Sequence, residues 1–380
     1  MIYLDNASTT KPSSGVRETV FKTLDIFGNP SSMHHLGVEA EKIIKKAKEN
    51  TARVIGVNPN NIYFTSGGTE SNNTAILGYC RANIKKGKHI ITTAVEHPSV
   101  LTPFKMLEAE GFDVTYLTVN SGGIISLEEL ANSVREDTIF VSIMLVNNEI
   151  GAIMPVSEVK KIIQQKNSKA VLHIDAVQGY GKVDCKPNQW GIDMLSASGH
   201  KIHAIKGCGI LYVADNINIK PLLNGGGQQN NMRSGTENTV GIAAFSKASE
   251  EILNYDREKV VILRSLLKEE IIKNIDRVKV NEAEGQNQAG HILNISFSGV
   301  RSEILLHSLE MYEIYVSTGS ACSTNKPMPS YVLTEMGCTP QEIDGAVRFS
   351  LCENITQEDI HYTVDALKKE VAQIRKYTRR

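Results

Sequence analysis

Cysteines are few in this chain, and none of them forms a recognisable pair. The 380 residues include six cysteines, with no C-x-x-C pair and no histidine at metal-ligand spacing beside them. Disulfide-stapled domains and zinc modules depend on such spacings. The neighbouring histidines His34 and His35 would point in different directions on a helix or a strand, which disfavours a metal site there. The sequence therefore supports neither a disulfide framework nor a metal centre.

Long apolar runs and charge of one sign are also missing. No stretch approaches the roughly 18 apolar residues that a membrane helix needs, and the N-terminal MIYLDNASTT lacks the basic and apolar regions of a secretory signal. The 41 basic and 42 acidic residues give a net charge of -1. This balance argues against a dedicated nucleic-acid or membrane-surface binder. We expect a cytoplasmic protein that is long enough for two domains.

Seven short apolar runs alternate with amphipathic helical stretches in the first two thirds of the chain. The runs are NIYFTS (61–66), HIITTAV (89–95), DVTYLTV (113–119), TIFVSIMLV (138–146), AVLHIDA (170–176), DMLSAS (193–198) and GILYV (209–213). This alternation predicts an α/β fold, with a mostly parallel seven-stranded sheet flanked by helices. We place a large domain at residues 16–249 and a smaller α+β domain at residues 1–15 and 250–380.

Polar residues follow five of these runs at the point where each predicted strand ends. Ligands of open α/β sheets bind at the carboxyl ends of the strands, so these residues are candidates for one site. Each has an ordinary explanation by itself, such as a turn, a hydrogen-bonded histidine or a solvated lysine. The candidates are Gly68 and Thr69 in SGGTESNN, His97, Asn148, Asp175, and Ser198, His200 and Lys201 in SGHK.

Taken together, these residues match pyridoxal 5′-phosphate better than other cofactors. The strings G-x-G-x-x-G and G-x-x-x-x-G-K-[ST], typical of dinucleotide and ATP sites, do not occur. Small residues before a helix form a phosphate cup. A lysine can hold the cofactor aldehyde as a Schiff base, and a buried Asp175 can keep its ring nitrogen protonated.

The chain resembles the cysteine desulfurases, which belong to the class V aminotransferase-like pyridoxal-phosphate enzymes of fold type I. The resemblance runs nearly end to end through ten ordered motifs. These are YLDNASTT, GNPSSMHHLG, FTSGGTESNN, VNNEIG, HIDAVQ, SGHKI, GGGQ, RSGTEN, STGSACS and VRFSL.

The resemblance implies a role for each site residue. Lys201 would form the Schiff base, His97 would stack on the ring, Asp175 would bind its nitrogen and Gln178 its hydroxyl. The phosphate would be held by Gly68, Thr69, Ser198 and His200, and by Thr236 across a homodimer interface. Asn148 and Arg348 would bind the carboxylate of the substrate, L-cysteine, through the planar fork of the arginine.

Cys322 lies in STGSACSTNKPMPS, residues 317–330, a run whose Gly and Pro content predicts a mobile loop. The resemblance implies that its thiolate attacks the substrate sulfur. The products would be alanine and a persulfide on Cys322, which would pass its sulfur to an acceptor protein in iron-sulfur cluster assembly or tRNA thiolation.

Three stretches depart from the family pattern, and other activities stay open. Ala204 and Ile205 replace Gly-Pro, residues 229–231 read Gln-Asn-Asn in place of Glu-Arg-Gly, and Cys352 occupies a position where we expect a small core residue. A selenocysteine lyase or a small-amino-acid aminotransferase would share the fold and the cofactor but not need Cys322. A non-catalytic sulfur carrier or assembly protein would lack bound cofactor.

Overall fold

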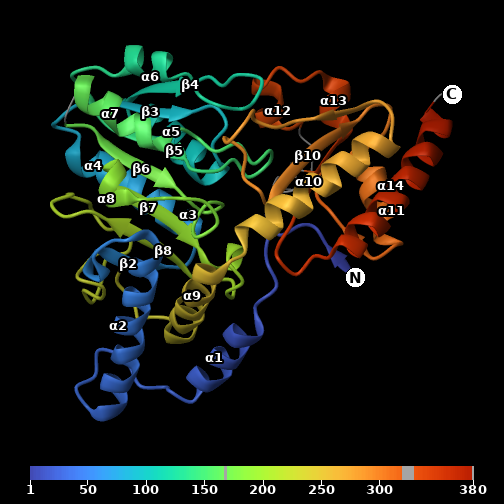
Figure 1. Cartoon of the computed structure of the whole chain (residues 1–380). Helices are drawn as coiled ribbons and strands as arrows, with labels where there is room; N and C mark the ends of the chain where they lie inside the picture. The colour runs from blue at the N-terminus through green and yellow to red at the C-terminus, as the bar shows by residue number, and fades with distance from the viewer. Residues whose placement is uncertain (167–168, 319–328, 379–380) are drawn as a thin grey trace.

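A seven-stranded sheet forms the centre of the molecule. The computed structural model describes residues 1–166, 169–318 and 329–378 (Figure 1). In spatial order the strands run β2-β8-β7-β6-β5-β3-β4. Their bounds are β2 (Ile62–Thr65), β3 (His89–Thr93), β4 (Asp113–Leu117), β5 (Thr138–Met144), β6 (Val171–Asp175), β7 (Met194–Ser198) and β8 (Gly209–Val213).

All seven predicted runs form strands, and the sheet is mostly parallel as expected. Only β8 runs antiparallel to its neighbours β2 and β7. The parallel pairings of β3 through β7 align the carboxyl ends of those strands along one edge. The α/β fold class is therefore confirmed.

Helices cover both faces of this sheet. Successive residues of a strand point to opposite faces. Accordingly, Ile90 belongs to the apolar cluster that contains residues of α5 and the 75–80 segment, whereas Ile91 belongs to the cluster that contains residues of α2, α7 and α9. The helices around the sheet are α1 (Ser14–Leu24), α2 (His35–Ile55), α3 (Gly68–Asn73), η2 (Thr74–Gly78), α4 (Tyr79–Asn83), α5 (Pro98–Ala109), α6 (Leu127–Ser133), α7 (Val156–Lys166), α8 (Pro187–Trp190) and α9 (Thr239–Glu251). The short turns are η1 (Pro59–Asn61), η3 (Gly199–Lys201) and η4 (Ile252–Asn254).

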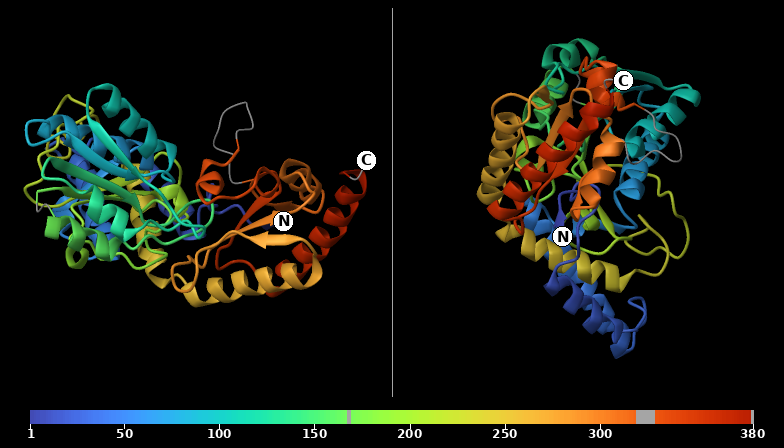
Figure 2. Two further views of the ribbon diagram at one scale, coloured as in Figure 1. Left: turned by 90° about the horizontal axis from the view of Figure 1, so that it is seen from above. Right: turned by 90° about the vertical axis from the view of Figure 1, so that its right-hand side faces the viewer.

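A second, smaller layer lies beside the large sheet (Figure 2). Its antiparallel sheet has the order β12-β10-β9, and β1 pairs with β11 next to it. The strands are β1 (Ile2–Tyr3), β9 (Val278–Val280), β10 (Ile292–Phe297), β11 (Ile314–Tyr315) and β12 (Ala346–Ser350). The helices are α10 (Arg257–Asn274), α11 (Ser302–Glu310), α12 (Tyr331–Glu335), α13 (Pro340–Asp344) and α14 (Gln357–Thr378).

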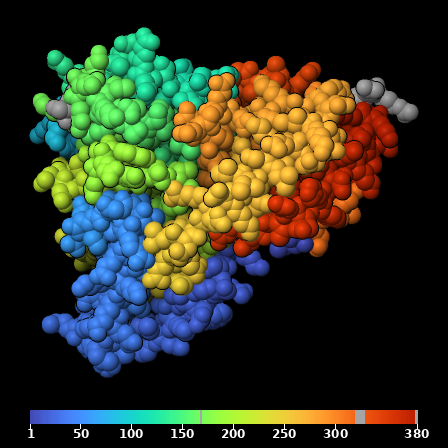
Figure 3. Space-filling view, viewed as in Figure 1, coloured from blue at the N-terminus to red at the C-terminus, as the bar shows by residue number. Residues whose placement is uncertain are grey.

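This smaller layer has its own apolar core. Ile2 and Leu4 join buried residues between Val260 and Ile374 in one cluster, separate from the clusters on the two faces of the large sheet. The exact domain limits at 16–249 and 250–380 stay a prediction. Helices α1 and α2 pack on α9 and project from the body of the molecule, as the space-filling view also shows (Figure 3).

The Gln-Asn-Asn departure has a local structural role. Gln229, Asn230 and Asn231 all adopt positive φ angles, of 49°, 57° and 63°, a conformation that asparagine tolerates better than most residues. This turn directs the Gln229 amide at β2, the first strand in the sheet order. The amide accepts a hydrogen bond from the Phe64 N–H at 2.6 Å and donates one to the Phe64 carbonyl at 2.7 Å.

None of the helices in the described parts of the chain has the length and apolarity to cross a membrane.

Candidate functional site

A cavity of about 260 Å³ opens at the carboxyl ends of the strands of the large sheet. Ten of the twelve residues predicted from the sequence line it, from both layers of the molecule. They are Gly68, Thr69, His97, Asn148, Asp175, Gln178, Ser198, His200, Lys201 and Arg348. The structure thus brings together side chains that lie up to 280 positions apart (348 minus 68).

Lys201 reaches the cavity because it follows directly on β7, in the turn η3. Its Nζ donates hydrogen bonds to the carbonyl oxygens of Ala7 at 2.5 Å and Ser8 at 2.7 Å. The N-terminal segment therefore forms part of the cavity wall, and the ammonium group is held there by backbone acceptors.

A chain of hydrogen bonds joins His97 to Asp175 behind the cavity. His97 Nδ1 lies 2.8 Å from Ser99 Oγ, which accepts a hydrogen bond from Asn72 Nδ2 at 2.9 Å. The same Asn72 nitrogen donates to Asp175 Oδ2 at 2.7 Å, and the other Asp175 oxygen accepts from the Val177 N–H. The ring of His97 and the carboxylate of Asp175 are thus fixed relative to each other.

The surroundings of His97 favour the neutral form of its imidazole ring. It is the N-cap of α5, where its Nδ1 accepts a hydrogen bond from the Ser99 N–H at 3.1 Å. Burial lowers its pKa, although the charge of Asp175 opposes this shift. An uncharged imidazole with an open face suits contact with a flat aromatic group.

The opposite end of the cavity has the geometry of an anion cup. The first helical residue after β2 is Gly68, so backbone N–H groups at this helix start are available to a ligand. Ser198 lies across from it, since a Cβ atom on Gly68 would be 3.6 Å from the Ser198 Cβ. His200 completes this end, and burial together with nearby lysines lowers its pKa to about 4.

Arg348 and Asn148 meet at a third corner of the cavity. Arg348 projects from β12, is only 3% exposed, and donates hydrogen bonds to the Asn148 carbonyl at 2.8 Å and to Ser8 Oγ at 2.6 Å. Asp5 pairs with the same guanidinium at 2.9 Å. Arg348 Nε, Asn148 Oδ1 and Gln178 Oε1 are buried polar atoms with no partner in the protein. Buried groups of this kind normally have one, which points to a polar ligand in the cavity.

Two predicted residues are not among those lining the cavity. Thr236 is exposed on the loop before α9, so its proposed contact with a partner subunit stays a prediction. Cys322 lies outside the described residues.

Asn72, Ser99, Ala7 and Ser8 also belong to the site but were not predicted from the sequence. All four lie in or beside motifs that were singled out, but a motif does not reveal which of its polar residues faces inward. Only the fold brings Asn72 within hydrogen-bond distance of Asp175.

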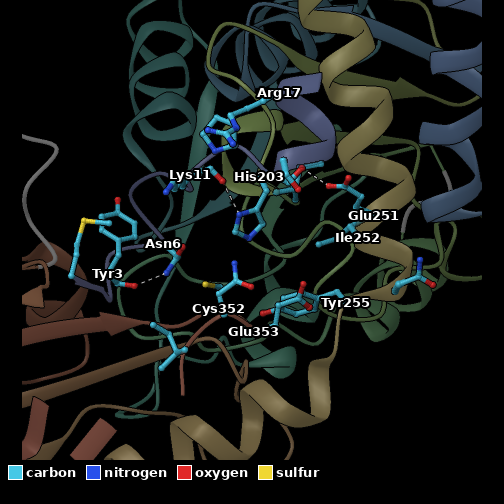
Figure 4. Close-up of a pocket in the computed structure, with 18 of the residues that line it drawn as sticks. Tyr3, Asn6, Lys11, Arg17, His203, Glu251, Ile252, Tyr255, Cys352 and Glu353 are labelled. Atoms are coloured by element: carbon cyan, nitrogen blue, oxygen red, sulfur yellow. Dashed lines mark hydrogen bonds between the residues drawn. The ribbon is translucent and has the colours of Figure 1, made fainter. Parts of the chain in front are cut away.

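A separate, larger cavity of about 720 Å³ lies between the N-terminal segment, α9 and the loop after β12 (Figure 4). It contains none of the predicted site residues. Cys352 lines it with an 8% exposed side chain that also belongs to the core of the smaller layer, and burial raises its pKa. These features match the expected packing role.

Across the parts of the chain that the structure describes, no group of three or more His, Cys, Asp or Glu side chains could hold a metal ion. His34 instead caps α2, accepting a hydrogen bond from the Gly37 N–H at 3.4 Å.

Comparison with known proteins agrees with this geometry. The aminotransferase class-V family model matches residues 2–363. Cysteine desulfurase IscS of Dictyoglomus turgidum is 42% identical over 98% of this chain and 95% of its own length, and that of Methanosarcina thermophila is 41% identical over 98% and 93%. A solved NifS-like protein superposes with a TM-score of 0.92 at 36% identity, covering 98% of this chain and 99% of its own. The resemblance inferred from the motifs is confirmed, and the chain belongs to the class-V aminotransferase family.

Proposed function

We propose that this protein is a pyridoxal-phosphate-dependent cysteine desulfurase, which converts L-cysteine to L-alanine and carries the sulfur as a persulfide on Cys322. The observation that carries the proposal is the meeting of Lys201, Asp175, His97 and Arg348 around one cavity. Relatives named cysteine desulfurase at about 40% identity over nearly the whole chain support it.

The residues of the cavity fit the cofactor. Gly68, Ser198 and His200 would hold its phosphate, Asp175 its ring nitrogen, and the unpartnered Gln178 Oε1 would accept a hydrogen bond from its hydroxyl. When bound, the cofactor supplies an electron sink for bonds broken at the substrate α-carbon. The hydrogen-bonded chain from His97 to Asp175 fixes the two side chains that would contact the cofactor ring.

Lys201 is the group placed to move the substrate α-proton. Its Nζ sits at the cavity wall next to the Ala7 and Ser8 carbonyls, which hold it within reach of a bound substrate. Arg348 and Asn148 bind the substrate carboxylate, because both line the cavity and both carry N–H donors for it, on the guanidinium and on the side-chain amide nitrogen Nδ2.

The sulfur step belongs to Cys322. Its thiolate forms an S–S bond with the substrate sulfur while the substrate Cβ–S bond breaks. The electron pair of the broken bond stays with Cβ, which takes up a proton, so L-cysteine and one thiol give L-alanine and one persulfide. A sulfur-acceptor protein, in iron-sulfur cluster assembly or tRNA thiolation, then removes the sulfur.

The physiological assembly is a homodimer in the cytoplasm. Large apolar side chains on α1 and the loop after it support self-association, since such exposed groups often mark protein interfaces. They are Phe21 (71% exposed), Leu24 (57%), Phe27 (79%) and Met33 (98%).

Two variants test the chemistry. Lys201→Ala should abolish both the yellow colour of the purified protein and alanine formation from cysteine. Cys322→Ser should keep the colour but lose alanine formation. A Cys322→Ser protein with full turnover would instead favour the selenocysteine lyase or aminotransferase, and a colourless wild-type protein would favour the non-catalytic sulfur carrier.

A further inference from the structure

The chain on either side of residues 319–328 is held by Arg348, which lines the cavity, and by Glu149 and Glu96, which adjoin lining residues in the sequence. We propose that Ser330 and Glu149 form a positioning pair, which fixes the point where this segment rejoins the body of the protein relative to the substrate-carboxylate site. The inference rests on the proposed function, in which Cys322 is the nucleophile.

The end before residues 319–328 is tied to Arg348. Ser317 and Arg348 exchange two backbone hydrogen bonds, from the Ser317 N–H at 3.1 Å and from the Arg348 N–H at 2.7 Å. Ser317 is only 2% exposed. The chain just before the Cys322 segment is therefore fixed beside Arg348, the residue that is proposed to bind the substrate carboxylate.

The end after residues 319–328 is tied to two further residues next to the site. Ser330 Oγ donates a hydrogen bond to Glu149 Oε2 at 2.5 Å, and Glu149 directly follows Asn148. Tyr331 Oη donates to the Glu96 carbonyl at 2.5 Å, and Glu96 directly precedes His97. Each anchor thus joins the Cys322 segment to the neighbour of a proposed site residue.

The Ser330–Glu149 pair is placed to be a strong anchor. Both side chains are buried, with 5% and 4% exposure, so the hydrogen bond is shielded from water. Burial raises the pKa of Glu149 to about 7, while the Ser330 hydroxyl and the charge of Arg348 oppose the rise. Ser330 also caps α12 by accepting from the Leu333 N–H at 3.1 Å. One hydroxyl therefore fixes both the start of α12 and its contact with the site.

Ser13 provides a matched control. It is also an N-cap serine that accepts from a backbone N–H, of Val16 at 3.0 Å, and donates to a glutamate, Glu251, at 2.6 Å. Glu251 lines the larger cavity of Figure 4, which shares no lining residue with the proposed site. Ser13→Ala therefore removes a cap and a serine–glutamate bond of the same kind without touching the Cys322 segment.

The test compares Ser330→Ala, Ser330→Thr and Ser13→Ala as cofactor-loaded full-length proteins. We expect Ser330→Ala to lower kcat for alanine formation about tenfold, because the nucleophile is misplaced. The KM for cysteine should stay within about twofold and the visible absorption unchanged, because substrate binding is not touched. Ser330→Thr keeps the hydroxyl group, so its kcat should stay near the wild-type value. The kcat of Ser13→Ala should also match the wild type.

A second measurement does not depend on turnover. The rate at which iodoacetamide alkylates Cys322, read on the peptide by mass spectrometry without cysteine present, should rise about threefold in Ser330→Ala and not in Ser330→Thr or Ser13→Ala. The other five cysteines are buried, so they interfere little.

The outcomes separate the two proposals. If Ser330→Ala matches Ser13→Ala in both kcat and alkylation, the positioning pair is wrong while the proposed function stands. A wild-type protein that forms no alanine would overturn the proposed function, and the positioning pair with it. If Ser330→Ala does not fold, Glu149→Leu replaces it, since this variant removes the acceptor of the Ser330 hydrogen bond; an unchanged kcat there would also overturn the pair.

Discussion

Asn72 is the side chain that holds Asp175 in place, through the 2.7 Å hydrogen bond to its Oδ2. Asn72→Ala removes this bond to a buried carboxylate, which is worth about 1.5–3 kcal/mol. We expect the concentration of pyridoxal phosphate that half-restores visible absorption to rise about tenfold. Asn274→Ala is the control, because it removes a hydrogen bond from a side-chain amide to the Glu270 carbonyl on α10, away from Asp175. Equal half-saturation in both variants would contradict the role of Asn72.

Glu96 makes stability depend on pH. It is fully buried, and burial raises its pKa from 4.5 to about 8. Between these values the unfolded chain releases the proton while the folded protein keeps it, so the free energy of unfolding falls as pH rises from about 4.5 to 8. Glu96→Gln cannot titrate, so it should match the wild type near pH 5 and exceed it by roughly 2–4 kcal/mol at pH 9.

Urea unfolding at pH 5, 7 and 9 measures this difference. Glu128→Gln, at an exposed carboxylate, should show no such trend. A constant difference between Glu96→Gln and the wild type across this range would mean that Glu96 is ionised in the folded protein at all three values.

Site residues at strand ends were predictable because the order of residues alone shows where an apolar run ends at a polar side chain. His97, Asp175 and Lys201 were found in this way. Asn72 and Ser330 were not, because their partners Asp175 and Glu149 lie 103 and 181 positions away in the chain. Such contacts depend on how the layers pack.

Strand β8 begins at a glycine because there is no room for a side chain. A Cβ atom on Gly209 would lie 2.6 Å from the Gly67 Cα and 2.8 Å from the Ala197 carbonyl. Gly209→Ala should therefore push β8 away from the turn that leads into Gly68. We expect a loss of roughly 1–3 kcal/mol of stability and weaker retention of the cofactor phosphate.

Gly337→Ala is the matched control for this prediction. Nothing lies within 4 Å of its Cβ position, and only its positive φ of 79° is strained by a side chain, at about 1–2 kcal/mol. Both variants should lose stability, measured by urea unfolding, but only Gly209→Ala should lose cofactor. Equal cofactor retention would show that the turn at Gly67 tolerates displacement.

Element types were predicted better than element details. The seven apolar runs all became strands, because buried strands of a parallel sheet are continuous apolar runs. Between α3 and α4 the structure places a π-helical turn, η2, which the sequence did not predict. Gly78 at its end packs against the Lys220 carbonyl, where a Cβ would lie at 2.5 Å. Lys220 lies in a loop far away in the sequence, so its contact with Gly78 produces no periodic pattern of apolar residues from which the π-helical turn could be predicted.

The whole molecule should be a dimer in solution. The exposed apolar residues of α1 and the loop after it project from the body of the chain (Figure 3). Sedimentation at micromolar concentration should give a mass of twice 41.8 kDa. Thr236→Ala should then weaken cofactor binding while leaving the mass unchanged. A strict monomer would remove Thr236 from the site and leave the exposed residues without a role.

The side-chain amide of Gln229 forms the two backbone hydrogen bonds with β2 that a neighbouring strand would otherwise form. An edge strand with a free N–H and carbonyl can pair with a strand of another molecule, and such pairing starts aggregation. Gln229 occupies both groups of Phe64, and its left-handed turn brings it there without adding a strand. Gln229 thus covers one pair of backbone groups at the open edge of the seven-stranded sheet, which disfavours backbone pairing between separate copies there.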